Sequence, residues 1–123
     1  MAIGQVTRVS LPYPSTWEVQ ASFGGRPSSL GTLVINNVSG NRVSGAISFR
    51  RAFIPIQGFW NENTRQFWFE SPYASFAGTL AFRDDPQINL RHYVLRGNVT
   101  MKTPSIRAGE TGTWTATTNM RMR

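Results

Sequence analysis

Apolar and polar residues alternate along most of the chain in short runs, and turn residues separate one run from the next. Between Arg42 and Arg50, for example, Val43, Ile47 and Phe49 share one side. Alternation with a period of two is typical of antiparallel strands that place one face on a core, and no stretch shows the period of a helix. The pattern predicts strands at residues 15–22, 29–38, 42–50, 52–60, 65–71, 75–83, 87–102 and 111–120.

Clusters of glycine, proline, asparagine and aspartate mark the turns between these runs. The cluster Gly24–Pro27 predicts a hairpin connection, because no helix follows it and it lacks the Lys-Ser/Thr pair of a phosphate-binding loop. The pair Asp84–Asp85, ahead of a proline, is also typical of a turn. We expect one domain at residues 15–120, an irregular lead-in at residues 1–14 and a tail at residues 121–123.

A degenerate repeat of the form apolar-x-Gly-x-apolar runs through the predicted strands. Its clear copies centre on Gly45, Gly58, Gly78 and Gly97, with weaker copies around Gly31 and Gly112. Glycine inside a strand lowers stability, so its recurrence needs a structural reason. Closure of the sheet supplies one, because the strands of a small barrel coil sharply around a crowded interior. We therefore predict a single-domain all-β fold, an eight-stranded antiparallel up-and-down β-barrel.

The alternative fold is a β-sandwich, because two packed sheets show the same alternation. Pro55, inside the fourth predicted strand, favours this alternative, since proline marks an edge strand or a bulge.

The fifth predicted strand is apolar on both faces, with Phe67 and Phe69 on one side and Trp68 on the other. Such a strand needs cover on both sides. In a one-layer barrel the outer cover comes from the N-terminal segment or from another subunit. We therefore expect a homo-oligomer, either a dimer or a tetramer.

The composition excludes several classes of protein. An apolar fraction of 40% with 15% charged residues is typical of a globular chain and not of a disordered one. The chain has no cysteine and one histidine, which excludes disulfides, cysteine-based zinc sites and three-histidine metal sites. No apolar run approaches the roughly 20 residues of a membrane-spanning helix, and the start carries no apolar segment typical of a signal peptide. We expect no metal and no cofactor; the compartment stays open, with the cytoplasm as the default.

Seven short segments follow one another in a recognisable order: Ser15–Trp17, Leu30–Ile35, Val43–Gly45, Ile56–Gly58, Gln66–Phe69, Ala74–Gly78 and Ile88–His92. In the layout of these segments the chain, over residues 15–120, resembles the avidin/streptavidin family of calycin-type barrels. The resemblance implies a barrel that holds a small ligand. In that family biotin is bound by polar groups of the first loop, a Thr and a Trp on the sixth strand, a Trp on the seventh and an Asp on the eighth.

The residues at these biotin-contact positions are different here. Ala74 and Phe76 stand in place of the sixth-strand Thr and Trp, and His92 stands in place of the seventh-strand Trp. The last strand has no Asp, and Asn119 is the nearest substitute. Because polar groups matched to the ligand give such a pocket its affinity, we expect no tight binding of biotin.

Five residues are the candidate ligand contacts of this barrel: Trp17, Trp68, Phe76, His92 and Trp114. Tryptophans at a barrel mouth build an apolar pocket, but they equally plug a barrel end or pack between subunits. The alternation places His92 on one strand face with Ile88, Leu90 and Val94, so we expect it inside the barrel. There it serves as the polar anchor of a ligand or as a core histidine with a hydrogen-bonding neighbour.

The formal net charge is +7, and all the basic residues except Lys102 are arginines. Arginine binds phosphate through its planar fork and stacks on aromatic rings, so a surface for nucleic acid or another polyanion is the second candidate function. The scatter of the bases along the chain favours the simpler interpretation that they are ordinary surface cations. The candidate residues for a polyanion are Arg50, Arg51, Arg83, Arg91 and Arg96.

Catalysis is the third and least supported function. The lone His92 belongs to no recognisable Ser/His/Asp set, and the glutamates are isolated, so no pair of carboxylates is visible. We assign no catalytic residue. The sequence predicts a non-enzymatic barrel that binds a small apolar or aromatic ligand and self-associates, with a purely structural or assembly barrel as a further alternative.

Overall fold

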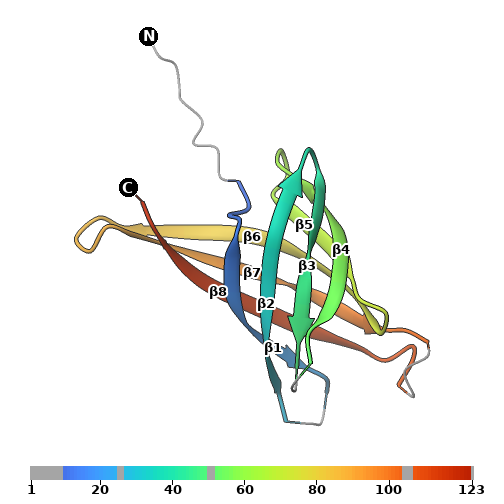
Figure 1. The fold of residues 1–123 in the computed structure, drawn as a ribbon. Coiled ribbons are helices and arrows are strands. Elements are labelled where there is room, and N and C mark those ends of the chain that lie inside the picture. The colour runs from blue at the N-terminus through green and yellow to red at the C-terminus, as the bar shows by residue number, and fades with distance from the viewer. Residues whose placement is uncertain (1–9, 25–26, 50–51, 104–106, 123) are drawn as a thin grey trace.

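The chain forms a closed barrel in which every strand pairs antiparallel with its neighbours in sequence and β1 pairs with β8 (Figure 1). The structure is a computed structural model, and it describes residues 10–24, 27–49, 52–103 and 107–122. The strands are β1 (Ser15–Ser22), β2 (Ser29–Ser39), β3 (Arg42–Ser48), β4 (Ile54–Asn61), β5 (Gln66–Glu70), β6 (Ala74–Asp85), β7 (Leu90–Met101) and β8 (Thr111–Arg121). The predicted fold class is confirmed, and closure of the sheet rules out the β-sandwich.

The order and number of the strands agree with the pattern of alternation, and the differences lie at strand ends. The seventh strand begins at Leu90 and not at residue 87, while β6 continues to Asp85. Pro55 lies inside β4 opposite Ala46, so it does not mark a free sheet edge. The predicted end of the third strand, at Arg50, falls outside the described residues.

The repeated glycines occupy inward-facing positions where neighbouring strands approach closely. A Cβ atom built on Gly97 would lie 1.7 Å from the carbonyl oxygen of Ala77, and one on Gly45 would lie 2.0 Å from that of Val34. No side chain fits at such distances, so the backbones are packed as only glycine permits. The proposed reason for the repeat, tight coiling of a closed sheet, agrees with these contacts. The other strand glycines are equally crowded: Gly31, Gly58, Gly78 and Gly112.

One end of the barrel, the upper end in Figure 1, is closed by the residues that precede β1. Leu11 is 1% exposed and belongs to the core, although it lies outside any strand. Ser15 Oγ donates a hydrogen bond to the carbonyl of Pro12 and accepts one from Trp17 Nε1, at 2.7 and 2.8 Å. The lead-in is thereby fixed over the buried indole of Trp17.

Glu62 gives this end a second connection. One of its carboxylate oxygens accepts a hydrogen bond from Ser10 and the other accepts one from Trp60 Nε1, each at 2.6 Å. Because Glu62 follows β4, the contact joins the lead-in to the β4–β5 turn. Hydrogen bonds to a charged acceptor are stronger than neutral ones, which favours a fixed plug at this end.

The strands β6 and β7 continue past the barrel as a long hairpin, visible at the left of Figure 1. We call residues 83–92 the β6–β7 projection; Phe82 and Tyr93, at its base, pack against or belong to the core. Strand β8 follows it as far as Arg121, whereas β1 pairs with β8 only between Thr113 and Thr117. Phe82 is half-buried there, with the guanidinium groups of Arg91 and Arg65 at 4.5 and 5.9 Å from its ring centroid. Among the described residues, no helix is long and apolar enough to cross a membrane.

Candidate functional site

The end of the barrel opposite the N-terminal plug is an open mouth that contains a cavity of about 560 Å³. The cavity is lined by residues at the ends of β1, β2, β3, β4, β6 and β7 and by residues of the loops β1–β2, β3–β4, β5–β6 and β7–β8. Its walls therefore come from most of the sheet. Its volume falls within the range of small-molecule sites. The lining side chains belong to Ala21, Phe23, Pro27, Ser29, Ile47, Phe49, Ala52, Ile54, Ser71, Tyr73, Ala74, Phe76, Val99, Met101 and Arg107.

A cluster of aromatic rings forms the deep side of this cavity. The rings of Phe69 and Phe76 stack with centroids 4.5 Å apart, and Phe49 lies nearly parallel to Phe76 with centroids 6.5 Å apart. The indole of Trp114 meets Phe69 and Phe76 edge-on at 5.5 Å. Offset and edge-on packing holds the rings in fixed orientations, so Phe76 presents a preformed aromatic surface to the mouth.

Trp114 is itself fixed by the glycine repeat. Its Nε1 donates a hydrogen bond to the carbonyl of Ala77 at 3.1 Å, and its ring lies where a Cβ of Gly78 would stand. Gly97 is its direct cross-strand partner. The two glycines therefore leave room for the indole that supports the floor of the cavity.

Polar groups lie at the rim of the mouth and not on its floor. Ser71 Oγ accepts hydrogen bonds from the backbone N–H groups of Tyr73 and Ala74, which shapes the β5–β6 loop. Lys102 Nζ forms an ion pair with Glu70, and this pair joins the β7–β8 loop to the end of β5. Among the described residues that line the cavity, Arg107 is the only charged one. The mouth is thus an apolar chamber with a polar edge.

The structure places three of the five predicted ligand contacts inside the barrel. Phe76 lines the cavity, and Trp114 lies directly behind it in the aromatic cluster. Trp17 is fully buried near the plugged end, where its ring meets that of Tyr93 at a centroid distance of 6.1 Å. Only Phe76 therefore faces the cavity itself, and Trp114 supports it.

The other two predicted contacts lie on the outer surface. Trp68 is 38% exposed and points away from the core, as its alternation with Phe67 and Phe69 predicts. The expectation that His92 faces inward is wrong, because Tyr93, Leu95 and Val99 provide the buried face of β7. His92 Nδ1 instead lies 2.6 Å from Asn119 Oδ1 on the adjacent strand.

Of the candidate polyanion residues, Arg83 and Arg96 line one hollow on the outer wall, whereas Arg91 is engaged in an ion pair. Arg91 makes two hydrogen bonds with the carboxylate of Asp84, at 2.5 and 2.9 Å, so its charge is already paired. This contact lowers the pKa of Asp84 below its ordinary value and raises the pKa of Arg91. Arg83 and Arg96 lie on the outer face of the sheet, and Arg50 and Arg51 lie outside the described residues.

The alternation pattern contained a signal for several cavity residues that the sequence prediction did not include. Phe49 was already placed on the apolar side of its strand, and Val99 follows the glycine of the clearest repeat. Both lie on the inward face close to the end of a strand, the position from which a side chain of a barrel reaches its mouth. Loop residues such as Tyr73 and Arg107 had no such signal.

The predicted self-association stays a prediction. The outer face of β5 carries Trp68 between Gln66 and the ion-paired Glu70, so it is less apolar than the aromatic run suggested.

A scan against protein-family models, a search of curated proteins and a search of solved structures each returned no match.

Proposed function

We propose that this protein is a non-enzymatic binding protein that holds a small apolar or aromatic molecule in the mouth of its barrel. The observation that carries the proposal is the difference between the two barrel ends. Leu11 and the Glu62 contacts close one end, whereas the other keeps a cavity of about 560 Å³. A barrel of this size has room for side chains or for one small ligand, and here the open end has room for the ligand.

The lining favours a ligand with a flat apolar part and a polar edge. Phe49 and Phe76 offer ring faces at the floor, and aliphatic side chains complete the wall. The hydroxyl of Tyr73 and the guanidinium of Arg107 stand at the rim, where a polar substituent of the ligand would meet them. A buried apolar part supplies most of the binding free energy, and the rim groups set the orientation.

The closed eight-stranded barrel is compatible with a calycin-like layout, and the resemblance to the avidin/streptavidin family adds support for a ligand inside the barrel. The ligand differs from biotin in this proposal, because the sixth-strand positions hold Ala74 and Phe76, which form no hydrogen bonds through their side chains. Their apolar character agrees with the lining of the cavity.

The test is titration with a neutral apolar fluorescent dye such as Nile red, comparing variants of two partly buried methionines. Met101 lines the mouth, whereas Met120 packs against the core from β8 and does not line the cavity. Met101→Gln introduces an amide into the apolar wall, which costs about 1–3 kcal/mol without a partner. We expect the dissociation constant to rise about tenfold or more for Met101→Gln and to stay near the wild-type value for Met120→Gln.

Equal dye affinity in the two variants would place the dye elsewhere and contradict the proposal. Absence of dye binding to the wild-type protein would also contradict it and would favour the structural barrel. Circular dichroism and thermal unfolding of both variants check that a lost signal does not come from unfolding.

A further inference from the structure

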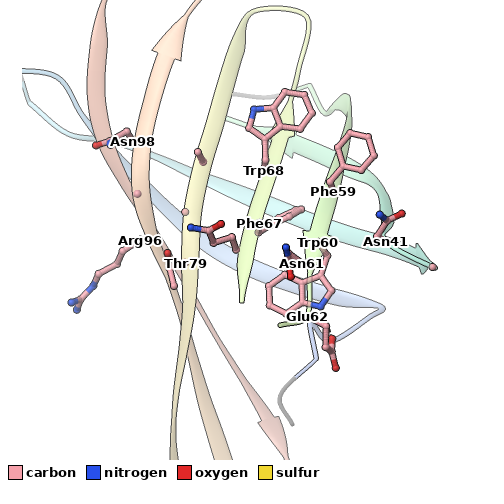
Figure 2. A pocket seen from close by; sticks show the side chains of 15 residues that line it. Asn41, Phe59, Trp60, Asn61, Glu62, Phe67, Trp68, Thr79, Arg96 and Asn98 are labelled. Atoms are coloured by element: carbon pink, nitrogen blue, oxygen red, sulfur yellow. Dashed lines mark hydrogen bonds between the residues drawn. The ribbon is translucent and has the colours of Figure 1, made fainter. Parts of the chain in front are cut away.

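The outer wall of the barrel carries a groove of about 920 Å³ across β4, β5, β6 and β7 (Figure 2). Its floor is low because Ala77, which faces outward between Trp68 and Asn98, has a small side chain, and the inward-facing Gly78 and Gly97 contribute only backbone there. Trp68 stands on the β5 side of this floor, and Arg96 and Asn98 stand on the β7 side, as Figure 2 shows. The small side chain of Ala77 thus leaves a hollow on the outer wall beside Trp68.

An exposed aromatic pair forms one wall of the groove. Phe59 and Trp68 are direct cross-strand partners whose rings stack with centroids 5.8 Å apart and planes 21° apart. They are 45% and 38% exposed, whereas Trp17, Trp60 and Trp114 are all at most 4% exposed. A second hollow of about 380 Å³ lies on the other flank of the same pair. The pair is therefore a ridge with a depression on each side. Phe59 lies between Arg42 and Trp68, so the ring face open to a planar group is the face of Trp68 on the side of Ala77.

Positive charge accompanies this ridge on both sides. The guanidinium of Arg42 lies 5.7 Å from the ring centroid of Phe59, and Arg96 stands across the floor. Among the described residues, no ion pair engages either arginine. Of the nearby carboxylates, Glu70 is paired with Lys102. Glu62 lines the groove, accepts hydrogen bonds from the neutral donors Ser10 and Trp60 and keeps its negative charge. The groove thus offers the open face of Trp68 together with Arg96 at the end away from Glu62, and Arg42 lies on the other flank of the ridge.

We propose that this groove binds single-stranded nucleic acid, with a base stacked on the open face of Trp68, one phosphate held by Arg96, and the strand continuing over the ridge to Arg42 on its other flank. Stacking platforms combined with a positively charged groove are the means by which proteins bind single strands without reading their sequence. The net charge of +7 adds a long-range attraction for such a polyanion. A double helix binds poorly, because its base faces are hidden within the stack.

Charge distinguishes a single strand from a second copy of this chain as the occupant. Two copies that met face to face through this ridge would bring Arg42 and Arg96 of each together, and like charges across an interface oppose association. A nucleic acid supplies planar rings and negative charge in the same molecule.

The test is binding of a fluorescein-labelled oligo(dT) 20-mer, measured by anisotropy and by quenching of intrinsic fluorescence, in which Trp68 is the exposed tryptophan. We expect binding to weaken steeply with salt and Trp68→Ala to raise the dissociation constant about tenfold, with Trp68→Phe between it and the wild type. Arg96→Gln removes one phosphate contact, so the slope of log affinity against log salt falls by about 0.7.

Arg83→Gln is the matched control, because Arg83 carries the same charge on the outer face of β6 but does not line the groove. We expect its salt slope to stay at the wild-type value, and a duplex of equal length to bind more weakly than the single strand. The proposal would be overturned if Arg83→Gln and Arg96→Gln reduced the salt slope equally. It would also be overturned if a folded Trp68→Ala variant bound the oligonucleotide with wild-type affinity. Absence of binding at low salt would have the same consequence.

Sedimentation of the same variants decides between the strand and a second copy. If Trp68→Ala converts an oligomer to a monomer and leaves oligonucleotide affinity unchanged, the ridge is a subunit interface and the proposal fails. The variant Met101→Gln, in the barrel mouth, should bind the oligonucleotide with wild-type affinity. The experiments on the mouth and on the groove therefore test the two proposed sites independently.

Discussion

Single residues show most clearly how this sheet is closed. At Gly97 the carbonyl of Ala77 occupies the space that any larger residue needs, and Trp114 packs as the cross-strand partner on the other side. A side chain there is excluded by backbone atoms, which do not rotate away as a flexible neighbour does. The absence of a side chain at this one position thus determines the spacing of β6 and β7 and leaves room for the indole of Trp114.

Gly97→Ala should therefore destabilise the protein by about 3 kcal/mol, because the strands β6 and β7 must separate to accept the methyl group. Chemical denaturation measures the change. Gly24→Ala is the matched control, since nothing lies within 4 Å of a Cβ at Gly24, and its effect should stay within about 0.5 kcal/mol. A loss at Gly97 no larger than that at Gly24 would show that strand spacing does not depend on this glycine.

The pair Asp84–Arg91 makes a prediction about pH. The hydrogen bonds from Arg91 lower the pKa of Asp84 in the folded state, so the pair stabilises the fold above the ordinary carboxyl pKa. Its contribution is lost as the pH falls through the lowered value, and it stays constant between pH 5 and 8. Titration of the Asp84 carboxyl by NMR should show its pKa rising in Arg91→Gln and unchanged in Arg83→Gln. If the pKa of Asp84 stayed the same in Arg91→Gln and rose in Arg83→Gln, its lowering in the wild-type protein would have another cause than Arg91.

At the scale of elements, the strands were predictable because each carries its own alternation and turn residues. The face of β7 was not, since apolar residues lie on both of its sides: Leu90 and Val94 on one, Leu95 and Val99 on the other. Pairing with β6 decides between them, and it places His92 opposite Arg83 on the outside. Register is a long-range property that alternation within one strand does not contain.

The same reasoning explains which part of the candidate site the sequence identified. Phe76 was identified because it stands at a ligand-contact position of the avidin/streptavidin layout, and Trp114 because it is one of the tryptophans in the predicted strands. Trp68 was correctly placed opposite Phe67 and Phe69, yet that alternation also means that it cannot share a cavity with Phe76. The rim residue Tyr73 was not predictable, since a loop conformation depends on the strands that it joins.

The N-terminal plug behaves as a further element of the barrel. Leu11 is 1% exposed, so Leu11→Ala should cost about 2–4 kcal/mol in unfolding free energy. Leu30→Ala, at a residue 70% exposed on β2, is the control and should change stability by less than about 0.5 kcal/mol. If urea denaturation gave the same loss of unfolding free energy for Leu11→Ala and Leu30→Ala, the lead-in would not be part of the folded core.

At the scale of the whole molecule, closure divides the sheet into two parts with different stability. Within the barrel every strand has a partner on each side, and its inward side chains share one core. Opening one strand there exposes that core, so backbone amides exchange mainly through global unfolding. The β6–β7 projection lies beyond the β1–β8 pairing and rests on Phe82, its two arginines and the Asp84–Arg91 pair. It is able to open without disturbing the core.

Hydrogen exchange should therefore be at least about tenfold faster for the amides of residues 83–91 than for those of residues 18–22 and 113–117. Phe82→Ala should accelerate exchange in the projection further, because it removes the ring on which both arginines pack. Protection in β1 and β8 should remain at the wild-type level in that variant. Uniform exchange across the sheet, or loss of protection in β1 on removal of Phe82, would show that the projection and barrel unfold as one unit. The mouth and the groove both lie within the more stable part, so binding at either site should leave exchange in the projection unchanged.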